Sequence, residues 1–268
     1  MYEEYWKLKT NPFENTPDPH FLYYSREHEE ALTRLIYAIR AGKGAAILTG
    51  EYGCGKTVLA RALIDKLDPT KYKVVMITNT QVPFIELLQE ITYQLGAEGS
   101  SQTKTELLRT LEDILRRNIS INKDTVIIID EAQLIKDKEM FEDLRLLLNL
   151  QKENRFLLTL ILIGQPELRE KMNRLPQLKQ RLSIKYHLNT LDEEETGEYI
   201  THRLRIAGRD SRIFTDRAIK SIYTYSEGTP RTINDICDMN LMVGFGRRVE
   251  YIDEELVREV IRDLGESW

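Results

Sequence analysis

The sequence predicts an α/β fold, in which a three-layer core with a parallel β-sheet is followed by a small all-helical domain. Between residues 26 and 189, short and nearly all-apolar segments alternate with helical patterns, which is typical of a parallel sheet covered on both faces. After residue 190 only helical patterns follow. A chain of 268 residues is long enough for one large domain or two moderate ones.

The elements follow in order along the chain. The first 25 residues carry several prolines and are expected to form an irregular linker, and a helix is expected next at residues 26–41. Five strands are expected at residues 45–49, 73–78, 125–129, 156–163 and 183–188. Helices are expected between them at 56–67, 83–95, 105–117 and 139–150, and after them at 193–207, 216–225, 231–245 and 253–264. The expected parts are therefore the linker (1–25), the α/β domain (26–189) and a helical lid (190–268).

Composition excludes several classes of protein. Charged residues make up 30% and hydrophobic residues 41% of the chain, as in soluble globular proteins. No apolar run approaches the roughly 20 residues of a membrane-spanning helix. The N-terminal residues do not resemble a secretory signal, and two cysteines make no disulfide framework, so a cytoplasmic location is expected. Residues 190–268 contain 11 basic and 17 acidic residues, a net charge of −6, which leaves +1 for the remainder; neither part has the charge of a basic nucleic-acid domain.

The strongest motif is GEYGCGKT at residues 50–57, which matches the pattern of a phosphate-binding loop and lies between an expected strand and an expected helix. Its glycines let the backbone approach phosphate closely, and the N–H groups of the helix N-terminus favour the anion. Lys56 is expected to reach the β- and γ-phosphates, and the Thr57 hydroxyl to bind Mg²⁺. Cys54 is interpreted as a small loop residue rather than a redox thiol. The expected nucleotide-binding residues are Gly50, Tyr52, Gly53, Cys54, Gly55, Lys56, Thr57 and Val58.

A second motif is VIIIDE at residues 126–131, where an apolar strand ends in two carboxylates. Asp130 fits the residue that holds Mg²⁺, and Glu131 fits the base that polarises an attacking water. Alone, such a run usually marks only a strand end. Downstream of a phosphate-binding loop, it indicates hydrolysis rather than simple nucleotide binding.

Further polar residues are candidates for the same site. Asn79 follows the second strand and is expected to orient Glu131, while Gln165 ends the fourth strand and is expected to contact the γ-phosphate or the water. Arg231 opens a helix of the lid and is expected to contact phosphate. Taken singly, each is also consistent with a turn or a solvated helix. Arg181, preferred over Arg174, is a candidate arginine finger for the ATP of a neighbouring subunit, although surface arginines are common.

With these motifs in place, the chain resembles an AAA+ ATPase, and within that class the general secretion pathway ATPase family of the ExeA/GspA type. The resemblance covers the chain almost end to end. The matching segments are residues 11–13 (NPF), 17–23, the phosphate-binding loop, 129–133 (IDEAQ), 162–168 (LIGQPEL), 203–208 and 228–234 (GTPRTIN). Longer members carry a transmembrane segment and a peptidoglycan-binding domain, so the expectation is a short form without either.

The resemblance implies ATP bound between the core and the lid, with residues 17–26 near the adenine. It also implies a homo-oligomer with an arginine finger across the subunit boundary. By resemblance, Asn79 is the glutamate-switch residue, Gln165 is sensor 1 and Arg231 is sensor 2. The expected activity is Mg²⁺-dependent ATP hydrolysis that supports assembly of a secretion, pilus or polysaccharide-export machine, with any membrane contact made through partners.

Two other functions remain open at this point. One is an ATP-dependent DNA-binding regulator of transposition of the MuB/TniB/IstB kind, which needs clustered cations. The candidate cations are Arg109, Arg116, Arg117, Lys171, Arg174 and Lys179, but Glu106, Glu112, Glu167 and Glu170 are interspersed among them, which favours mixed solvated helix faces. The other is a nucleotide-gated scaffold with negligible hydrolysis, against which the Asp130–Glu131 pair argues.

Overall fold

The computed structural model describes residues 1–98, 103–153 and 155–266. Its contacts divide the chain into two compact units. Residues 27–52 and 59–188 form an α/β unit, and residues 1–26, 53–58 and 189–268 form a second, mostly helical unit, of which 267 and 268 lie outside the described residues. The expected nearness of residues 1–25 to a nucleotide stays a prediction.

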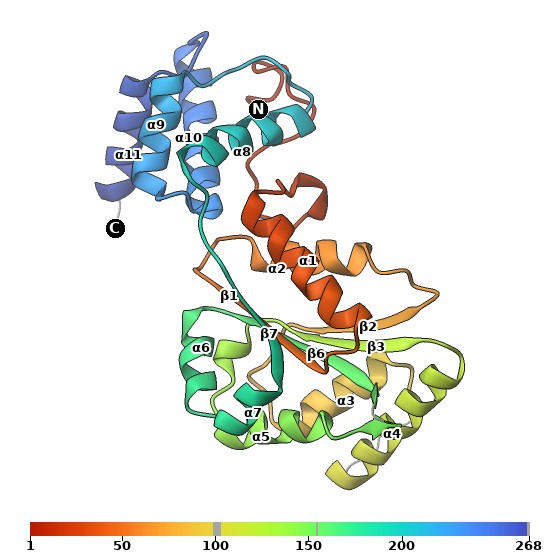
Figure 1. Ribbon diagram of the computed structural model, residues 1–268. Helices are drawn as coiled ribbons and strands as arrows, with labels where there is room; N and C mark the ends of the chain where they lie inside the picture. Colours follow the sequence, from red (N-terminus) through yellow and green to blue (C-terminus); the bar gives the residue numbers. More distant parts are fainter. Residues whose placement is uncertain (99–102, 154, 267–268) are drawn as a thin grey trace. The chain divides into compact units, whose positions relative to one another are not determined.

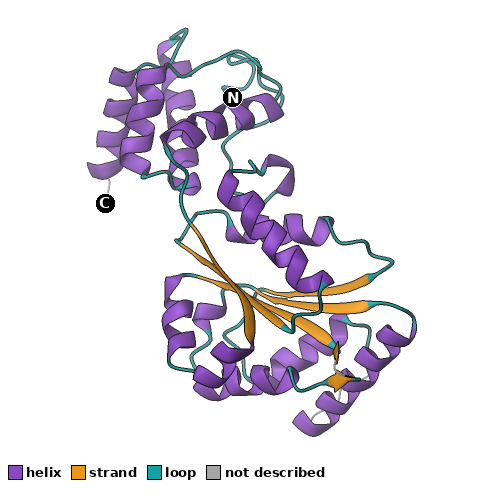
Figure 2. Ribbon diagram, in the orientation of Figure 1, coloured by secondary structure: helices purple, strands orange, loops and turns teal. Residues whose placement is uncertain are grey.

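The α/β unit is built on a five-stranded parallel sheet, which confirms the predicted fold class (Figures 1 and 2). The strand order is β2-β3-β6-β1-β7. The strands are β1 (Ala45–Gly50), β2 (Tyr72–Ile77), β3 (Asp124–Ile129), β6 (Leu158–Gly164) and β7 (Leu182–Leu188). Strands β1 and β6 are buried at every residue, which is consistent with their nearly continuous apolar sequences.

Helices cover both faces of this sheet, as a three-layer core requires (Figure 1). Helices α1 and α2 lie on one face. Helices α3 to α7 pack on the other, around a core that takes alternate residues from each strand, such as Ala45 and Ile47 of β1. The helices are α1 (Arg26–Arg40), α2 (Lys56–Asp65), α3 (Phe84–Gln94), α4 (Lys104–Ser120), α5 (Lys138–Leu147), α6 (Pro166–Asn173) and α7 (Pro176–Arg181).

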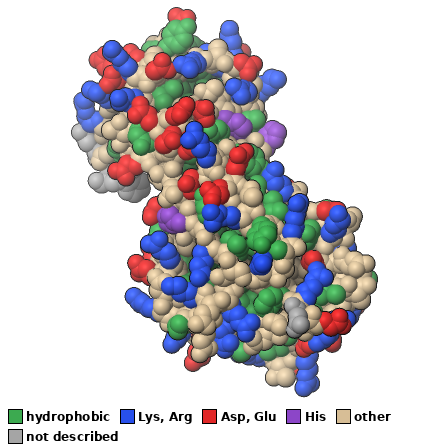
Figure 3. All heavy atoms as spheres, viewed as in Figure 1, with side chains coloured by type: hydrophobic (Ala, Val, Ile, Leu, Met, Phe, Trp, Pro, Cys, Tyr) green, Lys and Arg blue, Asp and Glu red, His purple; other side chains and the backbone are tan. Residues whose placement is uncertain are grey.

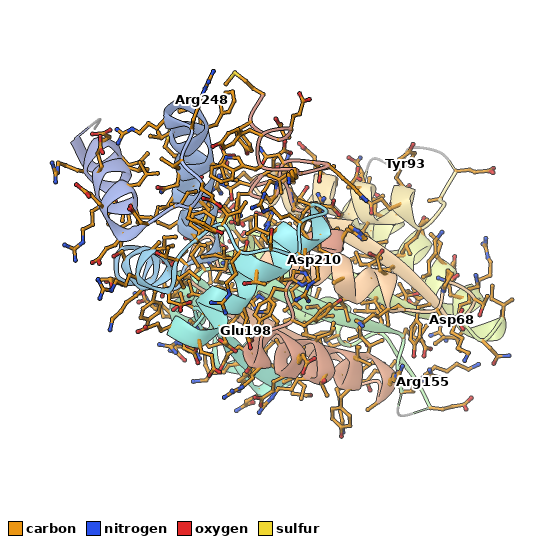
Figure 4. All side chains as sticks on the ribbon, turned by 90° about the horizontal axis from the view of Figure 1, so that it is seen from above. Asp68, Tyr93, Arg155, Glu198, Asp210 and Arg248 are labelled. Atoms are coloured by element: carbon orange, nitrogen blue, oxygen red, sulfur yellow. The ribbon has the colours of Figure 1, made fainter. Side chains whose placement is uncertain are left out.

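Some elements were not predicted from the sequence. Helices α6 and α7 are short, and each begins with a proline at its first position. The predicted strand at 156–163 is divided between β6 and a small antiparallel hairpin of β4 (Gln151–Lys152) and β5 (Arg155–Phe156). Arg155, labelled in Figure 4, forms an ion pair with Asp124 at the start of β3.

The second unit contains the four predicted C-terminal helices. These are α8 (Glu193–Ile206), α9 (Asp216–Ser226), α10 (Pro230–Arg247) and α11 (Glu254–Glu266). The N-terminal segment packs on them: the Trp6 indole is buried and donates to the Leu241 carbonyl at 2.9 Å. The only helix of that segment in the described residues is the 3₁₀ turn η1 (Pro19–Phe21). Nowhere in the described ranges is there a helix with the length and apolar character needed to cross a membrane.

Arg203 of α8 ties the N-terminal segment to the helices. Its guanidinium is buried and donates to the backbone carbonyls of Pro12 and Glu14 and to the Tyr199 hydroxyl. A buried charge is stable only when it is hydrogen-bonded in this way. The N-terminal residues therefore pack as part of this unit.

Gly228, just before α10, provides a stability prediction. Its φ is +73°, and a Cβ there would lie 1.8 Å from the Leu191 carbonyl oxygen. Gly228→Ala is expected to lower the free energy of unfolding by about 2–5 kcal/mol, from left-handed strain and overpacking together. Chemical denaturation measures this change. Gly246→Ala is the matched control, because a Cβ at Gly246 meets nothing within 4 Å; an equal loss in both variants would contradict the prediction.

Candidate functional site

The predicted site residues of the α/β unit follow the ends of neighbouring parallel strands. Asn79 comes two residues after β2, Asp130 directly follows β3, Gln165 directly follows β6, and Gly50 ends β1. The register is continuous across these strands. Parallel strands end at the same edge of a sheet, so the structure brings these four positions to one edge. Ligands of open α/β sheets bind at this carboxyl edge.

Asp130 and Glu131 are held by the backbone around them. Asp130 is 1% exposed, and its N–H donates to the Ile77 carbonyl of the adjacent strand at 2.8 Å. Its carboxylate accepts the Glu131 N–H at 2.9 Å. Glu131 has a left-handed backbone, with φ 52° and ψ 34°, which is costly for a residue with a side chain and is concentrated at functional sites. The chain thus turns sharply where the two carboxylates emerge from the sheet.

Asn79, the expected partner of Glu131, lies at the same edge of the sheet, but its side chain contacts Gln81 instead. Its side-chain oxygen accepts the Gln81 N–H at 3.3 Å, and the residue is exposed. The neighbouring Thr80 is buried and donates its hydroxyl to the Glu131 carbonyl at 3.1 Å. The switch role of Asn79 stays a prediction, and Thr80 is a contact to Glu131 that sequence reasoning missed. The sequence contained one signal for this contact: Thr80 is a polar residue next to Asn79, close to the end of a strand.

The carboxylate of Glu131 receives a hydrogen bond from Gln133, at 2.5 Å between Nε2 and Oε2. The other end of the Gln133 amide accepts the backbone N–H of Gln165 at 3.1 Å. Gln133 belongs to η2 (Ala132–Leu134), a 3₁₀ turn directly after the acidic pair. Sequence reasoning noted Gln133 within a matching segment but assigned it no role, because its two partners come from different parts of the chain.

The phosphate-binding loop has the local form that its sequence predicts. Gly53 and Gly55 have φ of +81° and +93°, which side chains rarely adopt, and helix α2 begins at Lys56. Lys56 is 6% exposed. Among the other predicted binding residues, Cys54 is buried, Thr57 and Val58 are half-buried, and Tyr52 is 59% exposed. A buried Cys54 fits a packed small residue better than an accessible redox thiol.

In the second unit, Arg231 lies against this loop. Its N–H donates to the Gly53 carbonyl at 3.3 Å, and a Cβ at Gly53 would lie 2.8 Å from the Arg231 Cβ. Pro230, at the first position of α10, is buried and sets the start of the helix. The predicted sensor-2 arginine therefore lies beside Gly53 within this unit.

Arg181, the predicted arginine finger, ends α7. Its guanidinium donates to the Asn149 side chain at 3.2 Å, and the residue is half-buried. Arg174, the less favoured candidate, directly follows α6 as its C-cap and is exposed. A role toward a neighbouring subunit stays a prediction for either residue.

The donor types suit the predicted ligands when each unit is taken by itself: those of residues 53–58 suit phosphate, and Asp130 of the α/β unit suits Mg²⁺. The loop offers backbone N–H groups, a helix N-terminus and an ammonium group, which suit phosphate. Asp130 supplies a buried carboxylate and Thr57 a hydroxyl, both hard oxygen donors. Mg²⁺ is usually bound through one or two carboxylates together with substrate phosphates rather than by a cage made entirely of protein groups.

The chain is similar in sequence to known proteins. A model of the AAA domain matches residues 39–172, which is half of the chain. The chain is 38% identical over 251 residues to general secretion pathway protein A of Aeromonas hydrophila, covering 92% of this chain and 45% of that protein. The chain thus spans less than half the length of that relative.

Solved structures share the fold at lower sequence identity. The Aeropyrum pernix ORC2 protein, solved as ADPNP–ADP complexes, has a TM-score of 0.72 and 18% identity over 95% of this chain and 71% of its own. Drosophila ORC bound to DNA has a TM-score of 0.71 and 18% identity over 94% of this chain and 64% of its own. The chain therefore belongs to the AAA family and is related in sequence to general secretion pathway protein A.

Proposed function

We propose that this chain hydrolyses ATP to ADP and phosphate with Mg²⁺, and that this activity supports assembly of a secretion, pilus or polysaccharide-export machine. The observation that carries the hydrolytic part is the placement of Asp130, Glu131 and Gln165 at the sheet edge where β1 leads into the phosphate-binding loop. The support for the biological role is the 38% identity to general secretion pathway protein A.

In this proposal each residue has a distinct task. The Glu131 carboxylate accepts a proton from the attacking water, and Gln165 contacts the water or the γ-phosphate. Lys56 and Arg231 stabilise negative charge on the phosphates. Thr57 and Asp130 hold Mg²⁺, which when bound neutralises charge on the phosphate oxygens. Asn79, which lies at the same sheet edge, helps to orient Glu131.

The proposed partners are other copies of this chain and secretion or pilus assembly proteins. In a homo-oligomer, Arg181 can act on ATP bound by the neighbouring subunit, since an arginine finger stabilises transition-state charge across the subunit boundary. The proposed location is the cytoplasm, with any attachment to the inner membrane made through partners.

A DNA-binding role receives less support from the side chains. Of the six candidate cations, Arg116 pairs with Glu112 at 2.6 Å, and Lys171 donates to backbone carbonyls of its own unit. On the face drawn in Figure 3, Lys and Arg side chains are interspersed with Asp and Glu. A non-specific DNA site needs several cations free to meet phosphates along one track. The likeness to ORC bound to DNA, at 18% identity, concerns the fold.

Phosphate release by the purified protein tests the enzymatic proposal. With ATP and Mg²⁺, specific activity is expected to rise with protein concentration, because assembly supplies the arginine finger by mass action. Chelation of Mg²⁺ is expected to abolish turnover. ATP binding without turnover across the whole concentration range would instead establish the nucleotide-gated scaffold.

A gel shift with ATP at two salt concentrations separates the DNA-binding alternative. The proposed function predicts no shifted duplex at low salt. A shift that weakens steeply as salt rises would favour the transposition regulator, because phosphate contacts release counterions.

A further inference from the structure

We propose that Gln133 is a positioning residue for hydrolysis, which aims the Glu131 carboxylate and couples it to the Gln165 segment through one buried amide. The inference rests on the proposed hydrolytic role of Glu131. All the residues involved belong to the α/β unit.

The first part of the argument is the geometry of the amide. Gln133 is 8% exposed, so its polar ends need partners within the protein. Its Nε2 donates to Glu131 Oε2 at 2.5 Å, and its Oε1 accepts the Gln165 N–H at 3.1 Å. The orientation of the amide follows from these partners, because a carboxylate only accepts and a backbone N–H only donates.

The second part is the shape of the surroundings. A Cβ at Gly164 would lie 2.6 Å from Gln133 Oε1 and 3.2 Å from the Gln133 backbone nitrogen. Only glycine at this position lets the end of β6 approach Gln133 so closely. Gly164 and Gln133 therefore form a matched pair: the small residue leaves the space that the amide fills.

The third part is that the backbone of Gln133 is itself held in place. Lys171 of α6 donates its ammonium to the Gln133 carbonyl at 2.5 Å and to the Ile135 carbonyl at 2.7 Å. Burial lowers the pKa of this lysine from its ordinary value. The helix that follows Gln165 thus anchors the turn that follows Glu131.

These contacts leave Glu131 with few degrees of freedom. Its N–H donates to Asp130, its carbonyl accepts from Thr80, and its carboxylate accepts from Gln133. A general base must lie within hydrogen-bond reach of the proton it removes, and a small misplacement is costly. The amide of Gln133 sets the direction of the carboxylate and makes it follow any displacement of Gln165.

Two substitutions distinguish the hydrogen bond from Gln133 to Glu131 from the hydrogen bond between Gln133 and Gln165. Gln133→Met keeps the approximate volume and removes both hydrogen bonds. Gln133→Glu keeps the shape and an acceptor for the Gln165 N–H, but it removes the donor to Glu131 and adds a like charge. Gln94→Met is the matched control: Gln94 is half-buried in the same unit and donates to the Glu90 carboxylate at 2.6 Å, away from the site.

Steady-state phosphate release and equilibrium binding of a slowly hydrolysed ATP analogue are measured for all four proteins. Both Gln133 variants are expected to lose about 10–100-fold in kcat, as is usual when a supporting partner of a site residue is removed. Their affinity for the analogue is expected to stay within about threefold, a factor worth less than 1 kcal/mol. Gln94→Met is expected to match the wild type in both measurements.

The outcomes are distinguishable. Wild-type kcat in Gln133→Glu would overturn the inference, even if Gln133→Met fails to fold, and equal losses of kcat and affinity would show a merely structural role. An inactive wild-type protein at every concentration would overturn the proposed hydrolysis and the inference with it. Active wild type with unaffected variants would overturn the inference alone.

Discussion

Glu131→Gln is expected to lower kcat for ATP hydrolysis by about 10²–10⁴-fold while ATP still binds. The amide has the same shape as the carboxylate and can still accept the hydrogen bond from Gln133, so the local structure is retained. It cannot take a proton from water, because an amide oxygen is a very weak base. Phosphate release and nucleotide binding, measured on the same preparation, check both halves of the expectation.

The control for this substitution is Glu153→Gln. Glu153 lies in the turn of the β4–β5 hairpin and shares the left-handed backbone of Glu131, with φ 50°, so the two substitutions impose the same local change. The control is expected to retain full turnover. Near-normal turnover in Glu131→Gln would exclude Glu131 as the base, and loss of turnover in both variants would point to a general effect on the fold.

Lys56→Ala is expected to reduce kcat/KM for ATP by about 10²–10³-fold. The ammonium group lies at the N-terminus of α2, where it adds a full charge to the partial charges of the loop N–H groups. Removal of a charged hydrogen bond costs about 1.5–3 kcal/mol in binding alone, and further charge develops on the phosphates during transfer. Initial rates over a range of ATP concentrations give kcat and KM separately.

Lys71→Ala provides the comparison for Lys56. The Lys71 side chain is 71% exposed and lies near Asp68 at the surface, so its loss changes the net charge by the same amount without affecting the loop. The variant is expected to behave as the wild type. Wild-type affinity and turnover in Lys56→Ala would remove the phosphate-binding role of the loop and, with it, the proposed function.

The sequence predicted those elements whose burial or backbone conformation depends on residues within one short segment. Strand β1 and helix α2 flank a loop whose glycines take left-handed conformations, and both the apolar run and the glycine spacing are visible in one short segment. The burial of β3 is likewise indicated by the run of β-branched residues at 125–129, directly before Asp130. Five strands and nine helices predicted from such patterns are present in the described residues.

Short elements that depend on tertiary contacts were harder to predict from the sequence. Helices α6 and α7 have eight and six residues, too few for a clear helical period, and are stabilised by packing in the core shared with α5. The packing of Trp6 on α10 joins residues more than 200 positions apart, so no local signal marks it. An irregular, proline-rich segment was therefore interpreted only as a linker.

The sequence by itself determined the fold class, the phosphate-binding loop and the acidic pair, because each depends on residues that are adjacent in the chain. The tertiary structure alone decided which polar groups meet at the sheet edge. The link from Glu131 through Gln133 to Gln165 requires β3 and β6 to be neighbours, and Lys171 to fold back from α6. Hydrogen bonds act over about 3 Å, whereas these residues are separated by up to 40 positions in the chain, so only the folded sheet can bring them together.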